Sequence, residues 1–188
     1  NKRILIYVGF FVLLLGAFYL LLFRDYDFSK SNLMVRNDNV QDFAFINQDG
    51  KKITQREVED KVYLVEYFFT TCKGICPKMN MSMEKIAADF KVEEDVIIVS
   101  HTVDPDKDSV GRMKHYADSL KIDGKKWILL TGTKEKLYEA ARKSYLLDDQ
   151  NNDKTAIEEQ FIHTQLFALV DKNGRVRGIY DGLNKEEL

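Results

Sequence analysis

The chain has 188 residues, with 28 basic and 30 acidic side chains and a formal net charge of −2 at pH 7. Hydrophobic residues make up 45% of the chain and charged residues 31%, a composition that excludes a disordered protein. The slightly acidic balance argues against a general nucleic-acid-binding protein. Two cysteines are too few for a disulfide scaffold or a four-cysteine zinc site. The length fits one domain, or one domain with an appendage.

Residues 4–23 form an apolar segment without a single charge, long enough to cross the hydrocarbon core of a bilayer as a helix. Lys2 and Arg3 precede it, and no small-residue cleavage site follows it. We predict that residues 1–24 are an uncleaved, single-pass membrane anchor, with a cleaved signal peptide as the alternative. The positive-inside rule then keeps the N-terminus cytoplasmic and places the rest of the chain on the extracytoplasmic, periplasmic-side face of the cell membrane.

The exported part is predicted to consist of a polar tether over residues 25–40 and one domain over residues 41–188. The anchor contains three of the 28 basic residues and no acidic ones, so the exported part carries 25 basic and 30 acidic side chains. An acidic domain beside a membrane indicates a protein or metal partner rather than anionic lipid.

The predicted elements of this domain alternate between strands and helices. Periodicity and turn residues predict strands at 43–46, 62–69, 96–99, 127–130, 167–170 and 176–180, helices at 54–59, 79–90, 110–120 and 133–147, and a polar loop at 148–159. This order favours a mainly parallel sheet flanked by helices and closed by an antiparallel hairpin. A thioredoxin-like fold fits the order, as do other three-layer α/β folds.

Two cysteines lie where the longest buried strand gives way to a helix. The sequence TCKGICP spans residues 71–77 and contains Cys72 and Cys76. Pro77 suits the first helical position, which would make Cys76 the N-cap, and the positive end of the helix would favour a thiolate. In an oxidising compartment the pair could form a disulfide, although so small a loop would add little stability.

Other side chains could complete a soft metal site with these thiols. His163 precedes a predicted strand, and two thiolates with one imidazole suit copper. A lone histidine is also commonly a simple surface residue. Met79 and Met83 share the helix face of Cys76, where they are thioether donors or, as their spacing favours, core residues. His101 is predicted to point to the opposite face of its strand from Asp104.

Four segments in this order resemble the Sco/SenC copper-chaperone family. They are TTCKGICP, HTVDPDKD at 101–108, LLTGT at 129–133 and FIHTQLFALVDKNGRV at 161–176. The resemblance covers residues 40–182. The combination of CxxxCP, VDPxxD and a late histidine is a specific signal, whereas CxxxC alone would be weak.

This resemblance implies a thioredoxin-like, usually membrane-tethered domain that binds copper(I) or copper(II) through Cys72, Cys76 and His163. It also implies a part in assembling the dinuclear copper site of cytochrome c oxidase subunit II, by copper delivery, thiol reduction or both. Asp104 matches a characteristic family position. The resemblance implies that it supports the copper ligands from the surrounding residues or faces a partner protein. Local chemistry equally favours a loop-start aspartate that caps its own backbone.

Two features depart from the family pattern. Many members have Asp before the late histidine, where this chain has Ile162, and relatives usually extend into a further helix after the hairpin. The main rival function is a thiol–disulfide oxidoreductase in which Cys72 attacks and Cys76 resolves without obligatory metal. A copper chaperone would not be an enzyme. The protein that receives its copper would be cytochrome c oxidase subunit II or another copper-accepting protein.

Overall fold

The computed structural model describes residues 2–23, 33–149 and 164–187, together with 152, 154, 156–157 and 160–162. The chain divides into two compact units, Asn1–Leu33 and Met34–Leu188. The boundary lies inside the predicted tether. The part of the predicted tether after Leu33 belongs to the second unit. Its residue Asn37 donates from its side chain to the carbonyl oxygens of Lys143 and Ser144, both at 2.8 Å.

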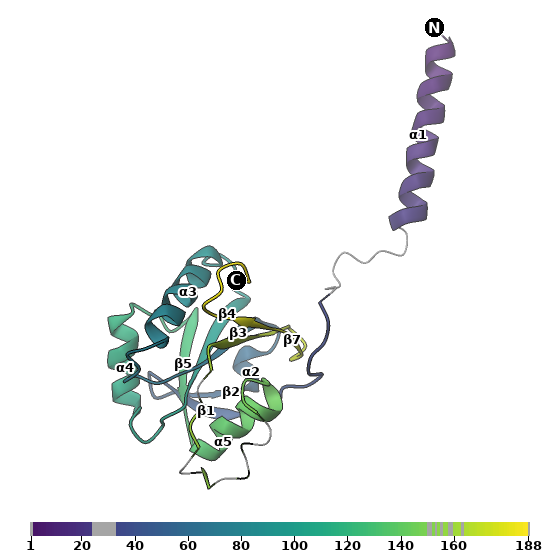
Figure 1. Ribbon diagram of the computed structural model, residues 1–188. Coiled ribbons are helices and arrows are strands. Elements are labelled where there is room, and N and C mark those ends of the chain that lie inside the picture. The colour runs from purple at the N-terminus through teal and green to yellow at the C-terminus, as the bar shows by residue number, and fades with distance from the viewer. Residues whose placement is uncertain are drawn as a thin grey trace. The chain divides into compact units, whose positions relative to one another are not determined.

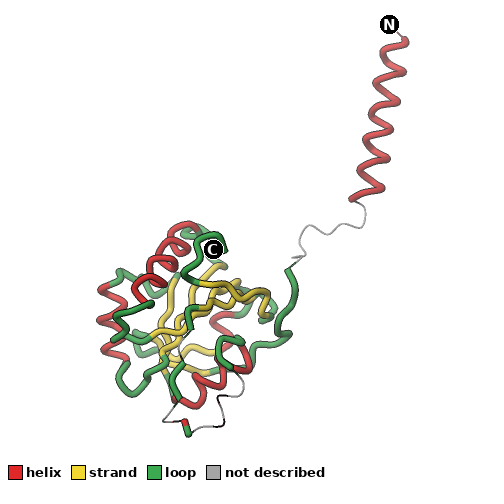
Figure 2. The backbone as a smooth tube through the Cα atoms, in the orientation of Figure 1, coloured by secondary structure: helices red, strands yellow, loops and turns green. Residues whose placement is uncertain are grey.

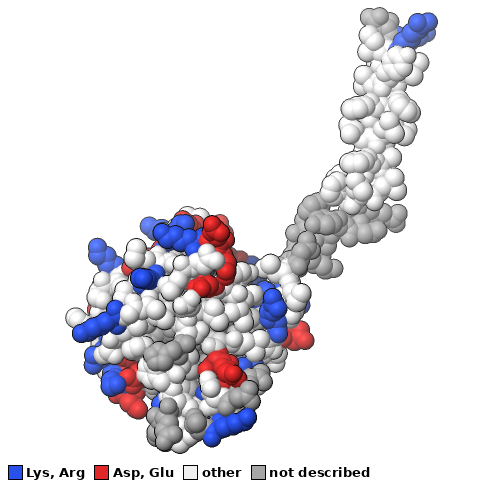
Figure 3. Space-filling view, viewed as in Figure 1, with Lys and Arg blue, Asp and Glu red and all other residues white. Residues whose placement is uncertain are grey.

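The described residues of the first unit form the helix α1 (Lys2–Phe23) and end at Leu33. The surface of this helix is uncharged except at its basic N-terminal end (Figure 3). Its length and composition suit a membrane span, and a signal sequence would pass the same test.

The second unit is a three-layer α/β domain (Figure 1, Figure 2). Its strands are β1 (Ala44–Asn47), β2 (Lys52–Thr54), β3 (Val62–Phe68), β4 (Val96–Thr102), β5 (Trp127–Thr131), β6 (Leu166–Val170) and β7 (Val176–Asp181). Its helices are α2 (Gln55–Val58), α3 (Cys76–Asp89), α4 (Val110–Ser119) and α5 (Lys134–Glu139), the last continued by a π-helical turn, η1 (Ala140–Ser144).

The seven strands form one mixed sheet in the order β2-β1-β5-β4-β3-β6-β7. Only the central strands β3, β4 and β5 run parallel, while the β1–β2 and β6–β7 hairpins add to them in antiparallel fashion on either side. The predicted α/β architecture with its closing hairpin is confirmed, but parallel pairing is confined to the centre. The carboxyl ends of β3 and β4 meet at one edge, where Phe68 pairs with Thr102.

The sheet has a hydrophobic core on each face. Alternation along β3 sends Leu64 and Phe68 to the face covered by α3 and α4, and Tyr63, Val65 and Tyr67 to the face covered by α2 and α5. Figure 1 shows these two helix pairs on opposite sides of the strands. Because both faces are covered, β3 reads as a nearly continuous apolar run.

Most predicted elements agree with the structure to within a few residues. A capping box of Thr54 and Glu57 begins α2. Strand β2 was not predicted. The helix predicted at 133–147 is shorter in the structure: α5 continues into the π-helical turn η1, which ends at Ser144. Several residues of the polar loop predicted at 148–159 lie outside the described part of the chain.

Candidate metal centre

The two cysteines lie together at the junction of β3 and α3. The Cys72 N–H donates to the carbonyl oxygen of Phe69 at 3.1 Å, which turns the chain back as soon as the strand has ended. The Cys76 N–H in turn donates to the Cys72 sulfur at 3.4 Å. Both are free thiols, with Cys72 half-buried and Cys76 only 3% exposed. The pair thus presents one partly accessible sulfur with a buried one behind it.

The start of α3 differs by one residue from the prediction. Ile75 is the N-cap, so Cys76 is the first helical residue and Pro77 the second. The Ile75 carbonyl oxygen accepts the N–H groups of Lys78 and Met79 at 2.9 and 3.0 Å, which makes it the first acceptor of the helix. Proline remains tolerated because the N–H groups of the first turn have no intrahelical partner.

The thiol of Cys76 is not activated in this conformation. Burial, followed by its hydrogen bond with Cys72, raises the pKa of Cys76 to about 12. The expectation that the helix N-terminus would favour a Cys76 thiolate is therefore wrong, because desolvation of the charged form outweighs the helix dipole here. A metal that binds this sulfur has to displace its proton.

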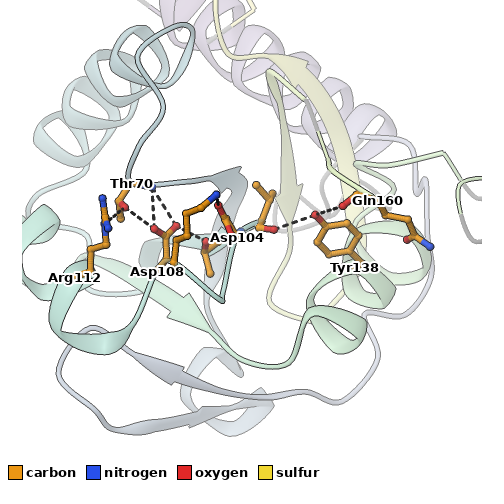
Figure 4. Close-up of polar contacts among 9 residues, drawn as sticks. Thr70, Asp104, Asp108, Arg112, Tyr138 and Gln160 are labelled. Carbon is orange, nitrogen blue, oxygen red and sulfur yellow. Dashed lines mark hydrogen bonds and ion pairs between the residues drawn. The ribbon is translucent and has the colours of Figure 1, made fainter. Parts of the chain in front are cut away.

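A buried carboxylate, Asp108, ties the cysteine segment to the loop that follows β4 (Figure 4). It accepts the backbone N–H of Thr70 at 3.1 Å and the hydroxyl groups of Thr70 and Thr102. Arg112 of α4 donates to the Thr70 hydroxyl at 2.9 Å. Thr70 lies two residues before Cys72, so this network fixes the start of the cysteine loop.

Asp104, at the front of the same loop, forms a surface ion pair. Its carboxylate lies 2.9 Å from the Lys107 ammonium group, and its backbone N–H donates to the Thr102 hydroxyl. The structure thus gives the main organising role in the VDPxxD motif to its last residue, Asp108. Sequence reasoning quoted this motif but considered only Asp104.

His163 lies outside the described residues, but the three residues before it are described. Gln160 and Ile162 are buried, and the ring of Phe161 stands edge-on to Phe69 with 5.1 Å between ring centroids. Phe69 is also the residue whose carbonyl oxygen Cys72 contacts. The chain leading to His163 therefore runs beside the cysteine loop.

Three further candidates are structural residues. Met79 and Met83 are 1% and 0% exposed in the core beneath α3, as their spacing favoured. His101 is fully buried on the other face of the sheet, stacked on Tyr67 at 5.1 Å and edge-on to Phe45 at 5.3 Å. Burial lowers the pKa of His101 to about 3, so this imidazole stays neutral.

Within the described part of the chain, no group of three His, Cys, Asp or Glu side chains forms a metal site. The two adjacent sulfurs nevertheless fit a soft metal, since thiolates select copper(I). Within the chain, a third ligand of these residue types has to come from outside the described residues, where His163 lies.

Comparisons with known proteins place the chain in a family. A family model described as SCO1/SenC matches residues 32–188. The SCO1 protein homolog of Bacillus subtilis is 34% identical over 149 residues, which cover 78% of this chain and 76% of that protein.

Solved structures agree with this placement. The structure of BsSco, described as a Sco family cytochrome c oxidase assembly protein with a disulfide switch, has a TM-score of 0.68 and 32% identity, covering 82% of this chain and 90% of that one. The structure of Arabidopsis thaliana ScoI with copper bound has a TM-score of 0.58, and the match covers 75% of this chain and 86% of that one. At 22% identity this match shows the fold alone. The fold is thus thioredoxin-like, and the chain belongs to the SCO1/SenC family.

Proposed function

We propose that this protein is a membrane-anchored copper metallochaperone in which Cys72, Cys76 and His163 hold copper. The observation that carries the proposal is the contact of the two cysteines, with the Cys76 N–H on the Cys72 sulfur, at an exposed strand–helix junction. Membership of a family that includes a copper-bound structure from Arabidopsis thaliana supports the choice of metal. Thiolates prefer copper(I), and imidazole suits copper in both oxidation states.

The proposed acceptor is the dinuclear copper site of cytochrome c oxidase subunit II, or another copper-accepting protein. A relative, BsSco, is described as a cytochrome c oxidase assembly protein. A site with three protein ligands leaves room for a ligand of the acceptor to enter, so copper can pass by ligand exchange. Both thiols must be reduced to bind metal, and each releases its proton on binding.

The helix α1 is proposed to be the membrane anchor, with the second unit on the extracytoplasmic face. Its uncharged length and the basic pair Lys2 and Arg3 support this orientation. Alkaline phosphatase fused after residue 188 should be active in intact cells, and the full chain should stay in the membrane pellet after carbonate extraction. An inactive fusion would contradict the orientation, and extraction by carbonate would contradict the anchor.

A second candidate function is thiol–disulfide exchange by the same pair. The unequal exposure of the two sulfurs favours it, because Cys72 is accessible for attack while Cys76 lies behind it to resolve. The description of BsSco as having a disulfide switch also supports this possibility.

One experiment separates the two functions. The reduced full chain in detergent is titrated anaerobically with copper(I) against a competing chelator, for wild type and for His163→Ala, and disulfide exchange is followed in parallel. The chaperone predicts one tightly bound equivalent that is lost or much weakened in His163→Ala. Copper binding that is absent or indifferent to His163 would contradict the proposed site, and exchange that survives in both proteins would then favour the oxidoreductase.

A further inference from the structure

The hydroxyl group of Tyr138 lies between the loop that follows β4 and the segment that leads to His163 (Figure 4). Tyr138 is a fully buried residue of α5. Its hydroxyl oxygen is 3.0 Å from the carbonyl oxygen of Val103 and 3.3 Å from that of Gln160. A phenol has a single proton, so the two carbonyl groups share one donor and are drawn to the same point.

Gln160 is held through its side chain as well as through its backbone. Its side-chain carbonyl oxygen accepts from the Arg142 guanidinium at 2.5 Å. Arg142 forms a largely buried ion pair with Asp148 at 2.8 Å, and its guanidinium carbon lies 5.6 Å from the centre of the Tyr138 ring. Because this cluster is mostly shielded from water, its hydrogen bonds are stronger than similar ones at the surface. Gln160 is thereby fixed three residues before His163.

The other end of this connection leads to the cysteines. Val103 follows β4 directly, and its N–H donates to the carbonyl oxygen of Phe68 at 2.8 Å. The preceding residue, Thr102, donates its hydroxyl to Asp108, which also holds the N–H of Thr70. One loop therefore contacts both the segment that carries the cysteines and, through Tyr138, the segment that leads to His163.

We propose that Tyr138 is a positioning residue: it fixes Gln160, and with it the start of the segment that carries His163, to the loop that also holds the cysteine segment. This inference rests on the proposed copper site. Metal affinity depends on how well the ligands are held before the metal arrives. Mutation of a residue that is hydrogen-bonded directly to a ligand typically weakens binding by about 10- to 100-fold, and Tyr138, which acts through Gln160, should lie at the low end of this range. Tyr138→Phe keeps the buried ring and removes only the shared donor, so we expect copper(I) affinity to fall about 10-fold.

The test is a double-mutant cycle on the reduced full chain in detergent, with copper(I) affinity measured against a chelator. The four proteins are wild type, Tyr138→Phe, His163→Ala and the double variant. If Tyr138 acts through His163, Tyr138→Phe weakens binding in the wild-type background and has no further effect in His163→Ala. A purely structural loss would weaken binding by the same factor in both backgrounds.

Tyr67→Phe is the matched control. Its buried hydroxyl also donates to one backbone carbonyl, but that carbonyl, of Leu137 at 2.9 Å, lies in α5 and not in the segment that leads to His163. We expect this variant to bind copper(I) like wild type.

Three outcomes overturn the inference: wild-type affinity in Tyr138→Phe, an equal loss in both backgrounds, or an equal loss in Tyr67→Phe. If fluorescence of Trp127 shows that Tyr138→Phe does not fold, Gln160→Leu, which removes the side-chain acceptor of Arg142, takes its place in the cycle under the same criteria. Wild-type binding that is absent or independent of His163 would instead refute the proposed copper site itself. The two failures are therefore distinguishable.

Discussion

The carboxylate of Asp108 accepts the backbone N–H of Thr70 at 3.1 Å, across 38 residues of sequence. This contact joins the loop after β4 to the first residues of the cysteine segment. Asp108 is fully buried, and the Thr102 hydroxyl at 2.6 Å is also among its partners. The position of the thiols thus depends on a carboxylate that is remote in sequence.

Asp108→Ala should lower the free energy of unfolding by about 2–4 kcal/mol, because the part-buried donors of Thr70 and the buried hydroxyl of Thr102 lose their acceptor. Asp108→Asn retains one acceptor oxygen and should cost about half as much. Urea unfolding followed by fluorescence of Trp127, the single tryptophan and only 3% exposed, measures both variants in the full chain. A change within about 0.5 kcal/mol for Asp108→Ala would show that the network does not hold the loop.

His101 should make stability depend on pH in the acidic range. Burial lowers its pKa to about 3 from an ordinary value of 6.5, so below pH 6.5 the unfolded chain takes up a proton that the folded chain does not. His101 therefore costs no stability above pH 6.5. Below that pH the free energy of unfolding falls, by about 2 kcal/mol at pH 5. His101→Phe should remove this loss. Parallel curves of unfolding free energy against pH for wild type and variant would contradict the prediction.

Glu66 should make the protein less stable as the pH rises, whereas His101 makes it less stable as the pH falls. Burial raises the pKa of this carboxyl group to about 7 from 4.5, although a hydrogen bond from Ser100 partly offsets the shift. Between pH 4.5 and 7 the folded chain keeps a proton that the unfolded chain releases, so stability falls as the pH rises, by about 3 kcal/mol in total. Glu66→Gln, which mimics the protonated group, should therefore gain stability relative to wild type between pH 4.5 and 8. A difference in unfolding free energy between Glu66→Gln and wild type that stays constant from pH 4.5 to 8 would refute this prediction.

The two thiols should react at different rates. Cys76 is buried with a pKa raised to about 12 by that burial, whereas Cys72 is half-buried. Limited treatment of the reduced protein with iodoacetamide at pH 8 should therefore label Cys72 first, because the thiolate is the nucleophile and needs access. Peptide mapping by mass spectrometry identifies the labelled residue. Modification of Cys76 at an equal or greater rate would contradict the assigned geometry.

Elements with strong local patterns could be predicted from the sequence. The apolar run of β3, the methionine spacing of α3 and the capping box of α2 each depend on neighbouring residues alone. Strand β2 was missed because it has only three residues and one buried position, too few for periodicity to detect. The place of Cys76 as the first helical residue depends on which carbonyl group starts the helix, which residue types alone do not decide.

The supporting contacts of the site were not predictable in the same way. Asp108 meets Thr70, and Tyr138 meets Val103 and Gln160, only because the sheet brings distant loops together. The motif VDPxxD contained Asp108, which was the available signal. The raised pKa of Cys76 also follows from tertiary burial, which outweighs the local effect of the helix end.

The central claim is that Cys72, Cys76 and His163 together hold copper. X-ray absorption at the copper edge of the copper(I)-loaded full chain reports the ligand atoms directly. The account predicts two sulfur neighbours and one nitrogen neighbour, with the nitrogen lost in His163→Ala. A copper ion bound by sulfur alone, or a nitrogen that persists in His163→Ala, would contradict it.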